Sequence, residues 1–313
     1  MNEKDIIQQY FTKDFNDRGI VKGIGDDAAI IKANNGCELV ITTDTMTVGK
    51  HFSKQAPAYA VGYKLMASNI SDIAAMGAAP RWATLNLTLS SLDQSWLEGF
   101  SRGLFECAEI NRVVLIGGDT TAGDSLTMSV QLIGEVPIGK ALLRSHAKVN
   151  DKLFVTGVIG NAVSALNYLQ ETNFNHDDLS DEQYTALYTP QSRVDLSIEM
   201  RELANAAIDI SDGLLNELDL ICHASNVGAC LQIDKIPMEH EKDAELAITG
   251  GEDYELLFTI PDENIHQLDR LSSKYNCPIT QIGMITDSQI IEIYQGDQVI
   301  PRPHYLGYDH FEK

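Results

Sequence analysis

Hydrophobic positions in the first half of the chain follow two spacings. Apolar residues recur at helical spacing across 57–76, and the pattern ends at Gly77, so we expect a helix there. A second helix is predicted over 93–110, with Asp93 as its N-cap. Short apolar or alternating runs predict strands over 28–31, 38–43, 81–89, 113–116 and 126–136. The first half therefore reads as α+β, with helices covering a sheet.

The second half alternates strands and helices. Periodicity lapses over 137–151, which predicts a linker and two domains, 1–137 and 138–313. The polar, acidic stretch 171–190 predicts a surface insert. The expected strands are 152–156, 207–210, 229–233, 255–260 and 278–285, and the expected helices are 162–169, 194–203, 214–224 and 265–275. This alternation predicts a C-terminal α/β domain, so the whole chain is α/β (α+β) in class.

Composition and net charge exclude several classes of function. The 313-residue chain has 45 Asp and Glu against 23 Lys and Arg, a formal net charge of −22, which argues against binding nucleic acid or anionic membranes. It favours cationic partners, metal ions, or anions that arrive bound to metal. The five cysteines form no CxxC pair, and no segment reads as a secretory signal or membrane span, so we expect a cytoplasmic protein.

Acidic residues recur beside small residues where predicted apolar elements end. The segments are GIGDD (23–27), TTDT (42–45), GGDTT (117–121), DISDG (209–213) and GGEDY (250–254), and Asp72 joins them from inside an apolar helix. A single acid of this kind usually caps a turn. Six such sites, placed by our prediction at strand ends, are expected to share one edge of a sheet. Carboxylates gathered there would repel unless cations lay between them, and oxygen ligands without His or Cys select Mg²⁺.

Glycines beside these acids let the backbone approach a ligand, and carboxylates can hold phosphate through Mg²⁺. ATP and a phosphate monoester together would require several divalent ions, which points to phosphoryl transfer. A phosphate acceptor is already anionic, so no general base is needed, and we assign no catalytic acid or base. His51 follows the Asp44 strand and could reach a substrate, whereas Arg144 is either a solvated linker residue or a phosphate contact.

Two familiar nucleotide motifs fail on inspection. GEVPIGKA (134–141) resembles a P-loop, but Ala141 supplies no hydroxyl for Mg²⁺. GIGDDA (23–28) resembles a dinucleotide fingerprint, but two acids would face the pyrophosphate and a strand, not a helix, follows.

Taken together, the motifs resemble the thiamine-monophosphate kinase family, of the aminoimidazole-ribonucleotide-synthetase-like superfamily. The resemblance runs from about residue 23 to 311. Its motifs are GIGDDAA (23–29), TTDT…GKHF (42–52), SDIAAMGAAP (71–80), GGDTTAG (117–123), DISDGL (209–214), GGEDYELLFT (250–259) and GYDHF (307–311). The family often has glycine in place of His146 and Asn150, which affects only the local loop shape.

The resemblance implies transfer of a phosphoryl group from ATP to thiamine monophosphate, giving thiamine diphosphate and ADP. It implies an N-terminal domain that binds ATP and Mg²⁺ and pairs across a homodimer, followed by a C-terminal α/β domain. The implied Mg²⁺ ligands are Asp27, Thr42, Thr43, Asp44, Asp72, Asp119, Asp209 and Asp212. The implied nucleotide contacts are Gly118, Asp119, Arg144 and Ser211, and the implied substrate contacts are His51, Glu252 and Tyr308.

Within that picture, Glu252 could pair with the cationic ring of thiamine or accept from its aminopyrimidine, and Tyr308 could stack on it. Two alternatives remain open. A sister ATP-dependent enzyme, such as a ring-closing synthetase or a selenide-activating dikinase, is one; the dikinase would favour a reactive N-terminal Cys, and none precedes Cys37. A non-catalytic acidic metal-binding protein is the other, and it would show no nucleotide-dependent thermal shift.

Overall fold

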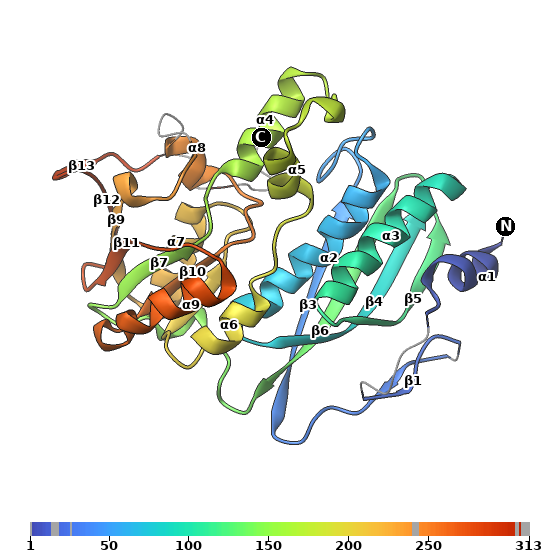
Figure 1. Cartoon of the computed structure of the whole chain (residues 1–313), viewed down its shortest axis with the longest axis horizontal. Coiled ribbons are helices and arrows are strands. Elements are labelled where there is room, and N and C mark those ends of the chain that lie inside the picture. The colour runs from blue at the N-terminus through green and yellow to red at the C-terminus, as the bar shows by residue number, and fades with distance from the viewer. Residues whose placement is uncertain (1, 14–18, 26, 240–243, 304–306, 308–313) are drawn as a thin grey trace.

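The chain folds into two sheet-based halves that share an extensive contact (Figure 1). The structure is a computed structural model that describes residues 2–13, 19–25, 27–239, 244–303 and 307. A short N-terminal helix, α1 (Glu3–Ile6), continues into a π-helical turn, η1 (Ile7–Phe11), and the hairpin-like pair β1 (Ile20–Lys22) and β2 (Ile30–Ile31) follows.

The first half is a four-stranded sheet in the order β3-β6-β4-β5. Its strands are β3 (Cys37–Thr47), β4 (Ala79–Leu89), β5 (Val114–Ala122) and β6 (Thr127–Pro137). β3 pairs with β6 in antiparallel register from Cys37↔Pro137 to Thr47↔Thr127, whereas β4 and β5 are parallel. Along β4 one face buries Ala83, Leu85 and Leu87 under the helices, as the alternating pattern predicts.

Two long helices cover one face of this sheet, α2 (Ala58–Ala75) and α3 (Gln94–Ile110), and confirm the predicted helices (Figure 1). Asp93 caps α3 by accepting from Ser95 N and Trp96 N. The two helices approach closely because glycine stands at their crossing: a Cβ on Gly62 would lie 2.1 Å from Phe100 O. α2 is buried on nearly all sides because the sheet, α3 and the second half surround it.

The second half contains a seven-stranded sheet in the order β13-β12-β9-β11-β7-β10-β8 among the described residues. Its strands are β7 (Lys152–Thr156), β8 (Ala206–Asp209), β9 (Gly228–Gln232), β10 (Leu256–Ile260), β11 (Ile279–Thr286), β12 (Ile291–Gln295) and β13 (Gln298–Ile300). Its helices are α4 (Asn161–Glu171), α5 (Asp181–Tyr188), α6 (Val194–Met200), α7 (Leu214–Ser225), α8 (Ala244–Thr249) and α9 (Leu268–Tyr275). Most neighbouring strands are antiparallel, and β12 with β9 is the parallel pair.

The structure corrects the predictions for the segment 171–190 and for the extent of β3 and β5. The segment 171–190 is not simply a surface insert, because α5 buries Leu187 and Tyr188. β3 and β5 extend well beyond the predicted strands, through TTDT and GGDTT, so Asp44 and Asp119 lie within strands and not at strand ends. Polar residues can continue these strands because both lie at edges of the sheet and one face carries no helix.

The linker that joins the halves contains a short 3-10 turn, η2 (Arg144–His146). Asn150 adopts φ +77°, the left-handed conformation that glycine takes most easily and asparagine next. The backbone at Asn150 therefore has a conformation that suits glycine. His146, in contrast, lies in an ordinary 3-10 turn that does not require glycine.

Candidate active site

Helix α2 carries the polar residues that connect the two halves. Asn69 is fully buried and its Oδ1 accepts from the backbone N–H of Asp44 at 3.2 Å. One turn further on, Asp72 Oδ2 accepts from Thr42 Oγ1 at 2.5 Å. α2 also packs against β8, which ends at Asp209. Carboxylates from β3, α2 and β8 are thereby brought to one place.

We call Asp44, Asp72, Asp209 and Glu217 the carboxylate cluster. The pKa of Asp72 is raised to about 7, mainly by burial and also by the charges of Asp209 and Asp44, against the lowering effects of Thr42 and Arg144. Burial likewise raises the pKa of Asp209 to about 7, with Ser71 opposing and with Glu217 and Asp44 adding to the rise. Burial also raises the pKa of Asp44. Four acids therefore repel one another at a single site.

Glu217 belongs to this site although sequence reasoning did not select it. Burial raises its pKa to about 7; its hydrogen bond to the Asp212 backbone lowers the pKa, and the Asp212 charge raises it. Its Oε1 accepts from Asp212 N at 3.1 Å and from Ser211 Oγ at 3.4 Å. The available signal was an acid in the first turn of the helix that follows DISDG. Glu217 holds the turn that presents Ser211 and Asp212.

Arg144 contributes a positive charge that acts on two acids of this cluster. It lies in η2, is exposed, and lowers the pKa of both Asp72 and Glu217. A guanidinium beside a group of acids is well placed to hold the phosphates of a metal-bound nucleotide. The geometry favours the phosphate-contact reading of Arg144 over a solvated linker residue.

The cluster's donors suit Mg²⁺ chemically, because carboxylate and hydroxyl oxygens are the ligands it prefers. Among the described residues, no three His, Cys, Asp or Glu side chains converge closely enough to hold an ion by themselves. The hydrogen bond from Thr42 also occupies one oxygen of Asp72. The carboxyl groups are therefore gathered, but their oxygens do not form a closed cage.

The other predicted ligands are not all in this cluster. Asp119 pairs across the sheet with Asn86, Asn86 with Ser129, and Ser129 with Thr45, so Asp119 shares a face with Thr45 and, by alternation, with Thr43. That face is opposite α2, whereas Thr42, which donates to Asp72, faces α2, and by alternation so does Asp44. β3 and β5 are also the two edges of the sheet, about 14 Å apart at roughly 4.8 Å per strand. The expectation of one shared edge is therefore wrong for Asp119 and Thr43.

Gly118 and Asp27 lie toward the outside of the molecule. Gly118 has φ +150°, and a Cβ there would lie 1.8 Å from Leu85 O, so only glycine lets β5 approach β4 so closely. Asp27 is exposed in the segment between β1 and β2.

The GGEDY loop is held from both halves. Glu252 has φ +70° and Tyr254 has φ +51°, and Glu252 N donates to Ser211 O at 2.7 Å. Buried Asp253 accepts from Gly160 N with both oxygens, each at 3.0 Å, while burial raises its pKa well above the usual range. Lys64 of α2 is 3% exposed and pairs with Glu252 Oε1 at 2.8 Å. The Glu252 charge is thus already neutralised by Lys64.

His51 lies beside Asp44. Its Nδ1 accepts from Thr47 N at 3.1 Å, which leaves Nε2 to carry the proton of the neutral ring. The charge of its protonated form opposes the effect of burial, which raises the pKa of Asp44. The third predicted substrate contact, Tyr308, lies outside the described residues.

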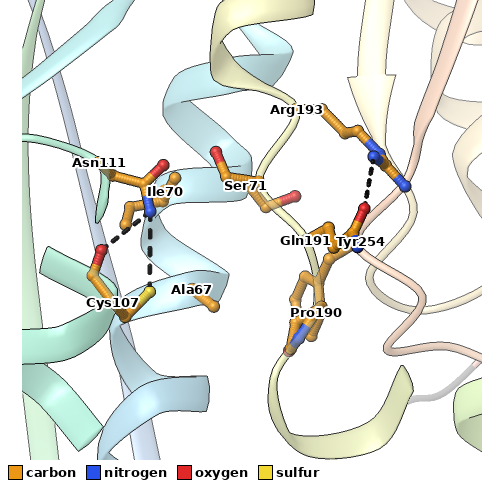
Figure 2. Close-up of a pocket in the computed structure, with 10 residues that line it drawn as sticks. Ala67, Ile70, Ser71, Cys107, Asn111, Pro190, Gln191, Arg193 and Tyr254 are labelled. Carbon is orange, nitrogen blue, oxygen red and sulfur yellow. Dashed lines mark hydrogen bonds between the residues drawn. The ribbon is translucent and has the colours of Figure 1, made fainter. Parts of the chain in front are cut away.

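Behind α2 lies a small cavity, shown in Figure 2. It is lined by Ser71 and Ala67 of α2, by Cys107 of α3 and its C-cap Asn111, and by the segment 190–193. Its volume is about 10 Å³, room for one water molecule and not for a substrate. Asn111 Nδ2 donates to Cys107 O at 2.9 Å at the wall of this cavity. This cavity is therefore not the substrate site.

Comparison with known proteins shows the family of this chain. Models of the AIR synthase related protein match residues 25–136 with its N-terminal domain and 148–295 with its C-terminal domain. The thiamine-monophosphate kinase of Escherichia coli (strain K12) is 39% identical over 322 residues, covering 99% of this chain and 98% of the relative. This chain belongs to the thiamine-monophosphate kinase family. The kinase of Bacillus subtilis (strain 168) is 35% identical and is matched over the full length of both chains.

Solved structures of the family agree in fold. The crystal structure of thiamine-monophosphate kinase from Stenotrophomonas maltophilia K279a matches with a TM-score of 0.83 and 36% identity, over 93% of each chain. The structure "AaThiL complexed with AMPPCP and TMP" matches with a TM-score of 0.79 and 28% identity, over 93% of this chain and 92% of the other. Within the described part of this thiamine-monophosphate kinase family member, no helix is long and apolar enough to cross a membrane.

Proposed function

We propose that this chain transfers the γ-phosphoryl group of ATP directly to thiamine monophosphate, giving thiamine diphosphate and ADP. The carboxylate cluster is the observation that carries the proposal, because buried acids that raise one another's pKa form a site for cations that carry phosphates. Family membership, shared with kinases of 35–39% identity, supplies the choice of substrate.

Several Mg²⁺ ions would be held by Asp44, Asp72, Asp209 and Thr42, with Asp212 at the neighbouring turn. Bound Mg²⁺ neutralises the negative charge that two phosphate-bearing substrates bring together. We propose that Thr43, Asp119 and Asp27 add ligands from the face opposite α2. The oxygen donors fit this ion, and neutral His or Cys ligands that would suit zinc are not needed.

The chain's own residues align the reactants. Arg144, Ser211, Gly118 and Asp119 are proposed to contact the nucleotide, with Arg144 placed to pair with its phosphates. The acceptor oxygen belongs to a phosphate that is already ionised near neutral pH, so no residue has to remove a proton. The chain therefore contributes orientation and charge compensation, and we assign it no general base.

On the substrate side, His51, Glu252 and Tyr308 are proposed to contact thiamine monophosphate. Because Lys64 already pairs with Glu252, hydrogen bonding to the aminopyrimidine suits Glu252 better than neutralising the cationic ring. Tyr308→Ala is expected to raise the KM for thiamine monophosphate by about tenfold if the ring stacks on the substrate. An unchanged KM would remove the stacking role.

We further propose a homodimer that works in the cytoplasm. The uncovered face of the first sheet exposes Leu39 (43%) and Ile41 (58%), which a second copy of the chain could cover. Residues 1–137 would form the dimerisation and ATP/Mg²⁺-binding domain, and residues 138–313 the C-terminal α/β domain. All five cysteines are free in the structure, which supports a reducing compartment.

A coupled ADP-release assay tests the proposal. ATP and Mg²⁺ are supplied with thiamine monophosphate, and unphosphorylated thiamine is the matched control. We expect ADP with the monophosphate alone, together with thiamine diphosphate detected by chromatography. A folded, ATP-binding protein that releases no ADP with thiamine monophosphate would overturn the assignment and turn attention to a sister enzyme of the superfamily. A protein that bound Mg²⁺ without any nucleotide-dependent thermal shift would be a metal-binding protein instead.

A further inference from the structure

A second hollow lies at the joint between the two halves and shares no residue with the carboxylate cluster. It has a volume of about 520 Å³ and is lined by residues within 139–148 and 201–205. Four of its described lining residues are basic, and none is Asp or Glu, in a chain with 45 acids and 23 Lys and Arg. We call this hollow the basic groove; its basic residues are Lys140, His146, Lys148 and Arg201.

Arg201 is fixed in the wall of the basic groove. Its Nη1 donates to Gly77 O at 2.7 Å, and its side chain is 14% exposed. Gly77 has φ +66°, and a Cβ there would lie 2.8 Å from Arg201 Cβ, so the glycine makes room for the arginine. Arg201 Nε is buried and makes no hydrogen bond within the described part of the chain. The guanidinium is thus held at Nη1, and its Nε is closed to solvent 3.6 Å from Glu202 Oε1, so Arg201 acts on the groove through its charge.

The acids beside the basic groove do not cancel its charge. Glu202 pairs with Lys140 Nζ at 2.7 Å and lies 3.6 Å from Arg201 Nε. Lys148 Nζ donates only weakly, at 3.4 Å, to the neutral side chain of Asn205. Asp151 also contacts the lining, because it accepts from Lys148 N and Asn205 Nδ2, so two carboxylates face three positively charged side chains and the groove retains a net positive charge.

The opposite wall of the basic groove is anchored by backbone contacts. Ser225 Oγ donates to Arg144 O at 2.7 Å and accepts from Ala147 N at 3.0 Å, which ties both ends of η2 to α7. Leu142 N donates to Met76 O at 3.1 Å and ties the entering chain to the end of α2. The groove is thus formed before a ligand arrives, which lowers the entropic cost of binding.

We propose that the basic groove binds an organic phosphate without a divalent metal. Lys140 and Lys148 would take its phosphate or diphosphate end, and the charge of Arg201 in the wall would add to the attraction. Small apolar residues of the lining, Ala141, Leu142, Ala147 and Ala204, would contact the rest of the molecule. The volume exceeds that of a bare phosphate and lies within the roughly 300–1,000 Å³ of ordinary ligand pockets. The site is independent of the proposed kinase reaction.

Binding of inorganic pyrophosphate in excess EDTA tests the proposal. Without divalent ions, the carboxylate cluster repels pyrophosphate, so titration calorimetry reports the basic groove. The test variant is Lys140→Gln/Lys148→Gln, and the control is Lys13→Gln/Lys235→Gln, which removes the same charge from exposed lysines outside the groove lining. ADP release with thiamine monophosphate is measured on all three proteins.

We expect wild type and control to bind pyrophosphate with similar affinity and the test variant to bind it at least tenfold more weakly. All three should keep their ADP release, because neither lysine pair belongs to the proposed kinase site. Equal affinity in all three proteins, or no binding in EDTA, would overturn the proposal. A protein with no kinase activity but the expected pyrophosphate pattern would refute the proposed function and leave this site standing.

Discussion

Two groups of buried acids in this molecule have opposite surroundings. Glu255 receives hydrogen bonds from Arg193 and, at 2.5 Å, from Thr156 Oγ1. Asp151 receives them from Asn205, Thr259 and the backbone of Lys148, all between 2.9 and 3.1 Å. In the carboxylate cluster, by contrast, burial raises the pKa of Asp72 and of Asp209, and neighbouring acids contribute to both shifts: Asp209 and Asp44 act on Asp72, and Glu217 and Asp44 act on Asp209.

The difference separates structural acids from functional ones. A buried carboxylate is expensive unless donors satisfy it. Where the protein supplies those donors, as at Glu255, the acid holds separate segments of the chain together, here Thr156 and Arg193. Where acids face other acids, the fold carries a cost that a bound cation would relieve. Burial alone does not make the distinction, because Asp151 and Asp209 are each 3% exposed.

The largest effect should come from breaking a satisfied pair. Arg193→Leu leaves Glu255 buried without its counter-charge and should lower the free energy of unfolding by about 3–5 kcal/mol. Urea denaturation measures the loss. The double variant Arg193→Leu/Glu255→Leu should recover much of it, because no charge then remains buried. If the single variant were as stable as wild type, Glu255 would not be a structural acid.

Removing a carboxylate from the proposed metal site should act on turnover. Asp44→Asn and Asp119→Asn should each lower kcat/KM for thiamine monophosphate at limiting Mg²⁺ by about 100-fold or more, since each loses a metal ligand. Asp151→Asn is the matched control, because it makes the same Asp-to-Asn change at a carboxylate whose hydrogen-bond donors are all groups of the protein. Its turnover per folded molecule should stay near that of wild type. Wild-type turnover in both ligand variants would end the metal-site hypothesis.

A smaller effect is expected in the pH dependence of stability. Asp72, Asp209 and Glu217 have folded pKa values of about 7, above those of unfolded acids near 4. The folded state therefore binds more protons between these values, and metal-free stability should fall as pH rises from about 5 to 7, then level off. Thermal melts in EDTA should show a loss of several degrees in Tm. Mg²⁺ should reduce that loss, and a flat profile in EDTA would contradict the assigned pKa values.

Sequence patterns predicted much of this molecule. The spacing of apolar residues predicted α2. It also singled out Asp72 within that helix, because a carboxylate is costly to bury without a partner. The motifs also placed Asp209 and Asp212 around the turn after β8. These features are local in the chain, so spacing and residue type reveal them.

Features that depend on tertiary contact were missed. Lys64 and Glu252 are 188 positions apart, and nothing in either segment shows that they pair. Asp44 and Asp119 were assigned to strand ends, but β3 and β5 continue through them, because polar residues are tolerated on edge strands with one open face. β12 and β13 were not predicted either, since each is short and partly polar.

The central claim is that the carboxylate cluster is the cation site, and titration calorimetry with Mg²⁺ and a non-hydrolysable ATP analogue tests it most directly. At pH 7, acids with a pKa of about 7 are half protonated, so metal binding should release roughly half a proton from each one engaged. Titrations in two buffers of different ionisation enthalpy measure that release. Asp209→Asn should reduce it, whereas Asp151→Asn should leave it unchanged. Mg²⁺ binding without proton release, or equal release in both variants, would contradict the account.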